Sequence, residues 1–307
     1  MKLAIPDMVS NSYFPVVAAV EMGFFAEEGL KVEHELIFPI DASFEALRDG
    51  RADLVGGSTH AALAAFPGYG GAKLLCAQAQ GMYWFLVVRA DLGAARGDLS
   101  VLKGLKIGAA PWVDIGLRRL LDEAGIDMEA EGITIAPVPG PIPPGVSFGV
   151  FAAQRLEEGM IDAFWANGMA AEVAVRRGAG TVVLDVRRGD GPKAAFNFTQ
   201  PGLVARTDWV AREPEAAAAA VRAVNRTHAA LAEDPERALA VGKKLFPEFE
   251  ASLISTLVAR DLPYYRTEVT PEFIDGMNGF LARCGLIDAP MAYDNIVADG
   301  VRDFWTR

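Results

Sequence analysis

The stretch Ala46–His60, ALRDGRADLVGGSTH, decides the fold. It predicts the end of a helix, a tight turn at Asp49-Gly50, a short buried strand at Leu54-Val55, and a polar strand end before an apolar helix. Glycines at a strand end let another molecule approach the backbone, and Ser58 or Thr59 is expected to cap the helix that follows. The N–H groups of that helix start, with two hydroxyls, are suited to bind a polar or anionic group.

A second stretch repeats this order of elements. Leu156–Asn167, LEEGMIDAFWAN, again predicts a helix, an acidic residue followed by Gly, an Asp, a short strand and a polar strand end. Asp49-Gly50-x-x-Asp53 aligns with Glu158-Gly159-x-x-Asp162, which places Ser58 and Asn167 at equivalent strand ends. Helix–turn–strand units are common in α/β proteins, so chance is one interpretation. The other is two α/β lobes, each presenting a strand end to a shared cleft.

Composition and charge exclude several classes of protein. The 307 residues carry a net charge of −11, which argues against nucleic acid as a partner because phosphate contacts need clustered Lys and Arg. The two cysteines, Cys76 and Cys284, form no CxxC pair, so neither a disulfide framework nor a Cys-rich metal site is expected. No His, Asp and Glu spacing resembles a metal triad, and no cofactor is expected. No apolar run reaches the roughly 20 residues of a membrane span.

The order of predicted elements divides the chain into two lobes. Alternating strands and helices extend to about residue 89, and a new strand–loop–helix series follows. From Glu213 onward the pattern is helical, and this tail is expected to pack on the first lobe. We therefore predict a discontinuous lobe one of 1–89 plus 204–307, and a lobe two of 90–203. Crossings near 88–92 and 198–205 would act as a hinge. The fold class is α/β, with a mixed sheet flanked by helices in each lobe.

Four motifs in order resemble a known family. They are GFFAEEGL (Gly23–Leu30), L-x-x-G-x-x-D (Leu47–Asp53), LKGLKIG (Leu102–Gly108) and GMIDAFW (Gly159–Trp165). This order resembles the type 2 periplasmic solute-binding proteins of the nitrate/sulfonate/taurine group of ABC transporters, which includes the thiamine-pyrimidine-precursor binders. The resemblance covers the chain to about Gly285. It implies a monomeric protein that closes two lobes over a small organic or anionic ligand and delivers it to an ABC permease and ATPase.

The resemblance also implies where the ligand binds. The loop after the first strand, the Gly-Ser-Thr strand end, and two strand ends of lobe two form the pocket in that family. The ligand-binding candidates are Asn11, Ser12, Tyr13, Ser58, Thr59, His60, Trp112, Val113, Trp165, Asn167 and Asn197. The uncharged polar members suit neutral or anionic groups, and the tryptophans suit a flat ring or an alkyl group. The alternatives are core packing for Trp112 and Trp165 and a structural hydrogen bond for His60.

Two other functions remain open. The superfamily includes pyrimidine synthases and desulfinases, and His60 with Ser12 would be the base and nucleophile of an enzyme on this fold. A cytoplasmic ligand sensor is the third possibility. The opening residues MKLAIPDMVS lack the basic region and apolar stretch of a secretory signal. We therefore expect a periplasmic location if a signal has been removed, and a cytoplasmic location otherwise.

Overall fold

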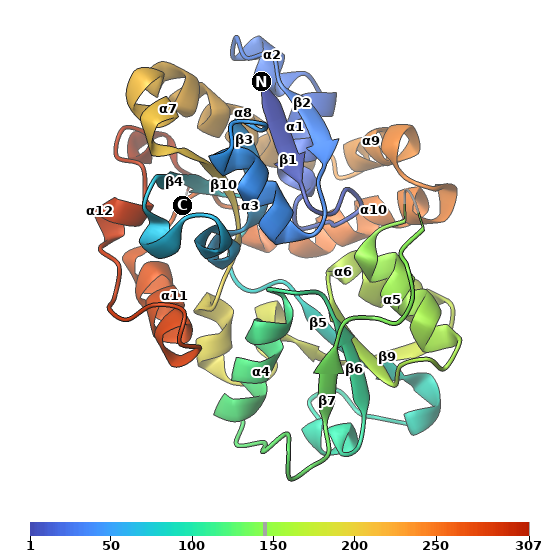
Figure 1. Cartoon of the computed structure of the whole chain (residues 1–307). Coiled ribbons are helices and arrows are strands. Elements are labelled where there is room, and N and C mark those ends of the chain that lie inside the picture. The colour runs from blue at the N-terminus through green and yellow to red at the C-terminus, as the bar shows by residue number, and fades with distance from the viewer. Residues whose placement is uncertain (144–145, 307) are drawn as a thin grey trace. The chain divides into compact units, whose positions relative to one another are not determined.

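The computed structural model describes residues 1–143 and 146–306, and the chain folds into two compact units. The first unit joins Met1–Gly81 to Asn197–Arg307, and the second unit is Met82–Phe196. Each unit contains a five-stranded mixed sheet flanked by helices (Figure 1). The predicted fold class, a two-lobe α/β protein with a mixed sheet in each lobe, is confirmed.

The sheet of the first unit has the strand order β2-β1-β3-β10-β4. Its strands are β1 (Lys2–Ile5), β2 (Glu33–Leu36), β3 (Leu54–Ser58), β4 (Ala72–Ala77) and β10 (Pro201–Arg206). β1 pairs in parallel with β2 and β3, whereas β10 runs antiparallel to both β3 and β4. The carboxyl ends of β1, β3 and β4 and the amino end of β10 therefore meet at one edge, which we call the carboxyl edge.

The helices of the first unit come from both of its chain segments. They are α1 (Phe14–Glu21), α2 (Phe24–Glu27), α3 (Ile40–Arg48), α7 (Thr207–Arg212), α8 (Pro214–Glu233), α9 (Arg237–Leu245), α10 (Glu248–Asp261), α11 (Pro271–Arg283) and α12 (Tyr293–Ile296). Helix α8 buries an alanine-rich face against α1, α2 and β4. The helical carboxyl-terminal part thus packs on the first unit, as the sequence predicted.

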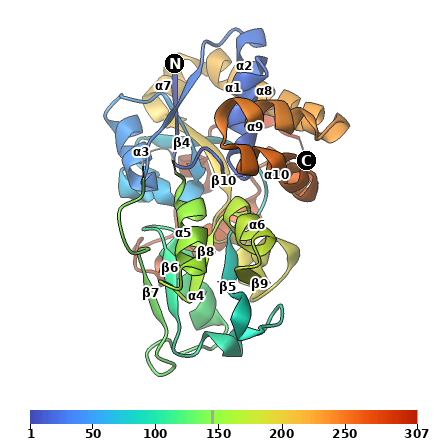
Figure 2. The same ribbon diagram turned by 90° about the vertical axis from the view of Figure 1, so that its right-hand side faces the viewer.

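The sheet of the second unit repeats the plan of the first, with the order β7-β6-β8-β5-β9. Its elements are β5 (Phe85–Arg89), β6 (Lys106–Ala109), α4 (Asp114–Glu123), β7 (Thr134–Ala136), α5 (Phe148–Glu157), β8 (Ala163–Ala166), α6 (Gly168–Arg176) and β9 (Gly180–Asp185). β5 is antiparallel to β8 and β9, and occupies the place that β10 has in the first sheet. Figure 2 shows α5 and α6 side by side, in contact with each other and with this sheet.

The repeated Gly-x-x-Asp motif performs the same task in both units. Gly50 and Gly159 have φ values of 73° and 70°, a left-handed conformation that glycine adopts without strain after a helix. Asp53 Oδ2 then accepts from the backbone N–H of Lys2 at 2.8 Å, and Asp162 Oδ2 accepts from that of Lys106 at 2.9 Å. Each aspartate therefore joins the start of β3 or β8 to the neighbouring parallel strand.

The strands near the two chain crossings belong to different units. β5 pairs with β8 and β9 in the second unit, although the range 1–89 had assigned it to the first lobe. The residues 197–203, assigned to lobe two, belong to the first unit and lead into β10. Strand pairing explains both placements, because a strand belongs to the sheet that satisfies its backbone N–H and C=O groups.

Candidate functional site

Polar side chains gather at the carboxyl edge of the first unit. Ser10–Tyr13 is the last part of the segment that connects β1 to α1, and Ser58 ends β3. Ser10, Asn11, Ser12 and Ser58 are each 0% exposed. Buried polar groups are costly unless they have hydrogen-bond partners, so the partners of these residues decide what they do.

Three of the predicted site residues, Asn11, Tyr13 and Ser58, have partners from distant segments. Asn11 Nδ2 donates to Asp261 Oδ2 at 2.6 Å, and the backbone oxygen of Asn11 accepts from the Tyr265 hydroxyl at 3.4 Å. The Tyr13 hydroxyl and Ser58 Oγ lie 3.2 Å apart. These bonds hold the loop after β1 against the end of β3 and against the residues that follow α10.

Thr59 and His60 form structural hydrogen bonds instead of the expected helix cap. Residues Thr59–Ala64 form a 3₁₀ helix, and no side chain caps its start, so the prediction that Ser58 or Thr59 caps this helix was wrong. Thr59 Oγ1 lies 3.3 Å from Thr199 Oγ1, and His60 Nδ1 lies 2.9 Å from the same oxygen. The His60 ring also packs edge-on against Phe280 at 5.7 Å. Both side chains thereby fix the segment that leads into β10.

This arrangement bears on the enzyme alternative. A nucleophile and its base must lie within hydrogen-bond reach of each other. Ser12 Oγ has no hydrogen-bond partner within residues 1–143 and 146–306, whereas His60 Nδ1 bonds to Thr199. The proposed Ser12–His60 pair is therefore not formed. Cys76 is buried, and burial raises the pKa of its thiol, so the reactive thiolate is disfavoured.

Three further buried polar residues near this edge were not among the predicted site residues. Gln78 follows β4 and Gln200 precedes β10; they are 0% and 1% exposed. Gln78 Nε2 donates to the backbone oxygen of Gly202 at 2.8 Å, and neither side-chain amide atom of Gln200 has a partner among the described residues. His228 on α8 bonds through Nε2 to the backbone oxygen of Gln78 at 2.9 Å. A polar residue at each strand end was the sequence signal for both glutamines.

In the second unit, the predicted residues have different surroundings. Trp112 and Val113, both half-buried, lie between β6 and α4. Trp112 has a φ of 67°, in the left-handed region that costs a non-glycine residue on the order of 1–2 kcal/mol. Such strain is concentrated at ligand sites. Val113 is the N-cap residue of α4 and supplies no side-chain hydrogen bond.

Trp165 and Asn167 lie at the end of β8. Trp165 is 0% exposed and its ring meets that of Trp84 edge-on at 6.1 Å, which is core packing. Its Nε1–H nevertheless has no partner in the described part of the chain. Asn167 Oδ1 accepts from the N–H groups of Met169 and Ala170 at 3.0 and 3.1 Å, so this oxygen caps α6.

Two further residues complete the comparison with the sequence. Asn197, a predicted ligand residue, is half-buried in the first unit and packs tightly on α11, where a Cβ added to Gly276 would lie 2.4 Å from its Cβ. Arg187, which the sequence analysis did not select, follows β9, is only 4% exposed and lies over the Tyr83 ring at 5.8 Å. The second unit therefore contains a buried cation.

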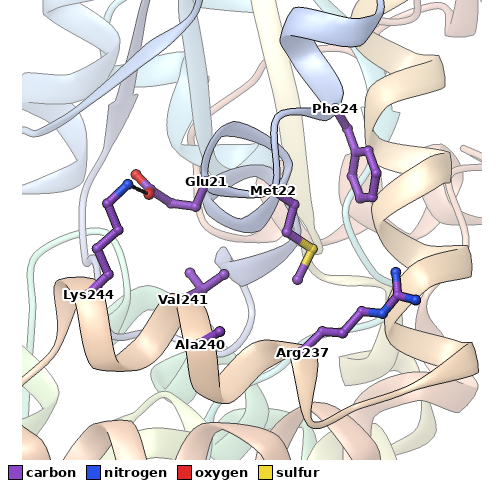
Figure 3. Close-up of a pocket in the computed structure, with 7 residues that line it drawn as sticks. All are labelled: Glu21, Met22, Phe24, Arg237, Ala240, Val241 and Lys244. Atoms are coloured by element: carbon purple, nitrogen blue, oxygen red, sulfur yellow. Dashed lines mark hydrogen bonds and ion pairs between the residues drawn. The ribbon is translucent and has the colours of Figure 1, made fainter.

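A hollow of about 400 Å³ on the first unit contains none of the predicted residues (Figure 3). Its lining is Glu21, Met22, Phe24, Arg237, Ala240, Val241 and Lys244. The Glu21 carboxylate accepts from Lys244 Nζ and, at 2.7 Å, from His34 Nε2, while Arg237 pairs with Glu233. Because these charges are already paired within the unit, we assign no ligand to this hollow.

The described residues contain neither a metal-binding cluster nor a membrane-spanning helix. Within residues 1–143 and 146–306, no group of three His, Cys, Asp or Glu side chains is arranged to hold a metal ion. In the same residues, no helix combines the length and the apolar character needed to cross a membrane.

Comparisons with known proteins place this architecture. The family model described as NMT1/THI5 like matches residues 10–238. The alkanesulfonate-binding protein SsuA from Xanthomonas axonopodis pv. citri, bound to MOPS, is similar with a TM-score of 0.73 and 14% identity over 96% of this chain and 97% of that one. The periplasmic nitrate-binding protein NrtA from Synechocystis PCC 6803 is similar with a TM-score of 0.69 and 17% identity, over 96% of this chain and 83% of that one.

An enzyme shares the fold. The desulfurization enzyme DSZB gives a TM-score of 0.66 at 14% identity, over 99% of this chain and 98% of that one. No curated protein matches the chain in sequence. At these identities the structural likeness concerns the fold, and it agrees with the resemblance that the four sequence motifs indicated.

Proposed function

The chain belongs to the NMT1/THI5-like family, and from this premise we propose that it is a solute-binding protein for a small organic or anionic molecule. Two proteins with the same fold are named for binding alkanesulfonates and nitrate, which supports binding rather than catalysis. Delivery of the ligand to an ABC permease and ATPase, and residence in the periplasm, belong to the same proposal. A hinge at the crossings 81–82 and 196–197 would allow capture and release.

The observation that carries this proposal is the polar cluster at the carboxyl edge of the first unit. Ser10 Oγ, Asn11 Oδ1 and Ser12 Oγ are buried and have no hydrogen-bond partner among the residues described. An unpartnered buried polar atom costs about 1–3 kcal/mol, and a cluster of such atoms at one sheet edge is typical of a site that a ligand completes. In α/β proteins, ligands bind beyond the carboxyl ends of the strands.

The test is a thermal-shift screen with sulfonates, nitrate, pyrimidines and small aromatic carboxylates, amides and sulfonamides. A ligand at about 100 times its dissociation constant adds about 2.7 kcal/mol to the free energy of unfolding, which is a clear shift. Each compound that shifts the melting temperature is then incubated with the protein and weighed by mass spectrometry. An unchanged mass supports a solute-binding protein, and a changed mass supports an enzyme like DSZB.

A matched pair of variants locates the site. Ser12→Ala and Ser255→Ala each remove a buried hydroxyl that has no partner in the described structure, but Ser255 lies within helix α10 and does not follow a strand. We expect Ser12→Ala to weaken binding of the best ligand about tenfold, and Ser255→Ala to leave it unchanged. Equal affinities of the two variants would place the ligand elsewhere.

A further inference from the structure

The unpartnered atoms at the carboxyl edge have a defined hydrogen-bond character. Asn11 Nδ2 donates to the carboxylate of Asp261 at 2.6 Å. A carboxylate only accepts, so this contact fixes the orientation of the Asn11 amide. Asn11 Oδ1 is therefore the atom that remains without a partner in the described structure, and it is an acceptor.

Gln78 is fixed by the same reasoning. Its Nε2 donates to the carbonyl oxygen of Gly202 at 2.8 Å, which leaves Oε1 as an unpartnered acceptor in the part of the chain that the structure describes. A Cβ added at Gly56 would lie 3.3 Å from Gln78 Nε2 and 2.8 Å from Ile5 Cδ1. The Gln78 side chain thus lies near Ile5, the last residue of β1.

His228 presents a third acceptor. Its Nε2 contacts the carbonyl oxygen of Gln78 at 2.9 Å and must carry the proton of that bond. Burial lowers the pKa of His228 to about 4, so the ring is neutral at pH 7 and Nδ1 has a lone pair. No described residue donates to this Nδ1.

Contacts within the first unit connect these three residues. The His228 ring stacks on Tyr265 with centroids 4.9 Å apart, and the Tyr265 hydroxyl donates to the backbone oxygen of Asn11. His228 in turn donates to the backbone of Gln78. Asn11 and Gln78 follow β1 and β4, so strand order and these hydrogen bonds both place the three residues at the carboxyl edge. The nearby Ser10, Ser12 and Gln200 side chains can donate or accept.

We propose that the first unit receives the hydrogen-donating end of its ligand, an uncharged amide or arylamine N–H group, through two of the three acceptors Asn11 Oδ1, Gln78 Oε1 and His228 Nδ1. This inference rests on the proposed function and narrows its ligand class. A ligand N–H completes acceptors that are otherwise buried without a partner, whereas a sulfonate or carboxylate oxygen would bring lone pairs against lone pairs. The site should therefore prefer uncharged compounds with an N–H group over oxyanions of the same shape.

The test compares pairs of compounds that differ only in this group. The pairs are benzamide with benzoate, benzenesulfonamide with benzenesulfonate, and methanesulfonamide with methanesulfonate, titrated at pH 7.5 by calorimetry. In each pair for which binding is measurable, we expect the compound with the N–H group to bind more tightly than its oxyanion counterpart, by about tenfold or more.

The outcomes separate this inference from the proposed function. Tighter binding of the oxyanions overturns the donor preference and leaves a solute-binding protein for anions. Binding by neither member of any pair, with no shift in the wider screen, overturns both. The wild-type titrations decide these outcomes even if a variant fails to fold.

Variants then assign the preference to a residue. Gln78→Met keeps the length of the side chain and removes Oε1, so we expect the advantage of the amide over the carboxylate to fall about tenfold. Gln80→Met is the matched control. Gln80 lies two residues after Gln78, and its Nε2 donates to the backbone oxygens of Arg266 and Glu268. An unchanged advantage in Gln78→Met would exclude Gln78 Oε1 as the receiving atom.

Discussion

His228→Gln should remove a loss of stability that acid causes in the wild-type protein. His228 is 5% exposed, and burial lowers its pKa from the ordinary 6.5 to about 4. The unfolded chain therefore binds a proton at a pH where the folded chain does not. Between pH 6.5 and pH 4 the unfolded state holds more protons, so the free energy of unfolding falls as the pH falls through this window, and below pH 4 it changes no further.

The size of the effect follows from the two pKa values. Each pKa unit corresponds to about 1.4 kcal/mol, so the full loss is about 3 kcal/mol, of which about 2 kcal/mol is lost by pH 5. Glutamine cannot be protonated in this range, and its amide can still donate toward the backbone oxygen of Gln78. The carboxyl groups of the chain titrate in both proteins and cancel in the comparison.

The assay is urea unfolding followed by circular dichroism at pH 7.5 and pH 5. We expect the free energy of unfolding to fall by about 2 kcal/mol more in the wild-type protein than in His228→Gln between these two pH values. Any difference in the free energy of unfolding that the substitution causes at pH 7.5 does not affect the result, since only the change in this free energy between the two pH values is compared. Parallel losses in the two proteins would show that His228 is protonated in the folded state and would refute the reasoning.

Three further predictions concern packing, capping and the second unit. In Gly202→Ala the new Cβ would lie 2.6 Å from Leu74 Cδ1 and 2.7 Å from Thr59 Cγ2, so urea unfolding should show a loss of about 1–3 kcal/mol. Gly279 lies in α11 with open space around it, so Gly279→Ala should raise the free energy of unfolding by up to about 1 kcal/mol. A similar loss of stability in Gly202→Ala and Gly279→Ala would contradict the packing argument. Asn167→Ala should lower the free energy of unfolding by about 0.5–2 kcal/mol, because it removes the cap of α6. Asn167→Asp should lower it much less, because the Asp carboxylate also accepts from the first N–H groups of α6. Equal losses in the two variants would exclude the cap. Trp165→Phe keeps a ring against Trp84 but removes Nε1–H and part of a buried ring, so the melting temperature should fall as it does for a core truncation. Ligand binding should weaken about tenfold as well, and an unchanged affinity would make Trp165 a core residue only.

The sequence predicted those parts of the fold that depend on local pattern. The two Gly-x-x-Asp motifs identified equivalent turns because a left-handed glycine and a strand-starting aspartate are both local requirements. The alternation of strands and helices likewise predicted two mixed sheets. The edges of the two units were harder to predict, because β5 and β10 each join a sheet through partners that lie far away in the sequence.

The candidate site was only partly predictable for the same reason. The position of Ser12 and Ser58 at the carboxyl edge could be predicted because they follow strands. The capping role expected for Ser58 or Thr59 failed because Thr59 and His60 bond to Thr199, about 140 positions further along the chain. Gln78 becomes a defined acceptor only through Gly202 and His228, 124 and 150 positions away. No local pattern contains those contacts.

The most direct test of the account is a calorimetric titration of the purified protein with the best compound of the screen, followed by mass spectrometry of the recovered ligand. We expect saturable binding that Ser12→Ala weakens about tenfold and Ser255→Ala leaves unchanged, and a ligand recovered with its mass unchanged. A ligand recovered with a new mass, or binding that both serine variants leave unaltered, would contradict a solute-binding site at the carboxyl edge of the first unit.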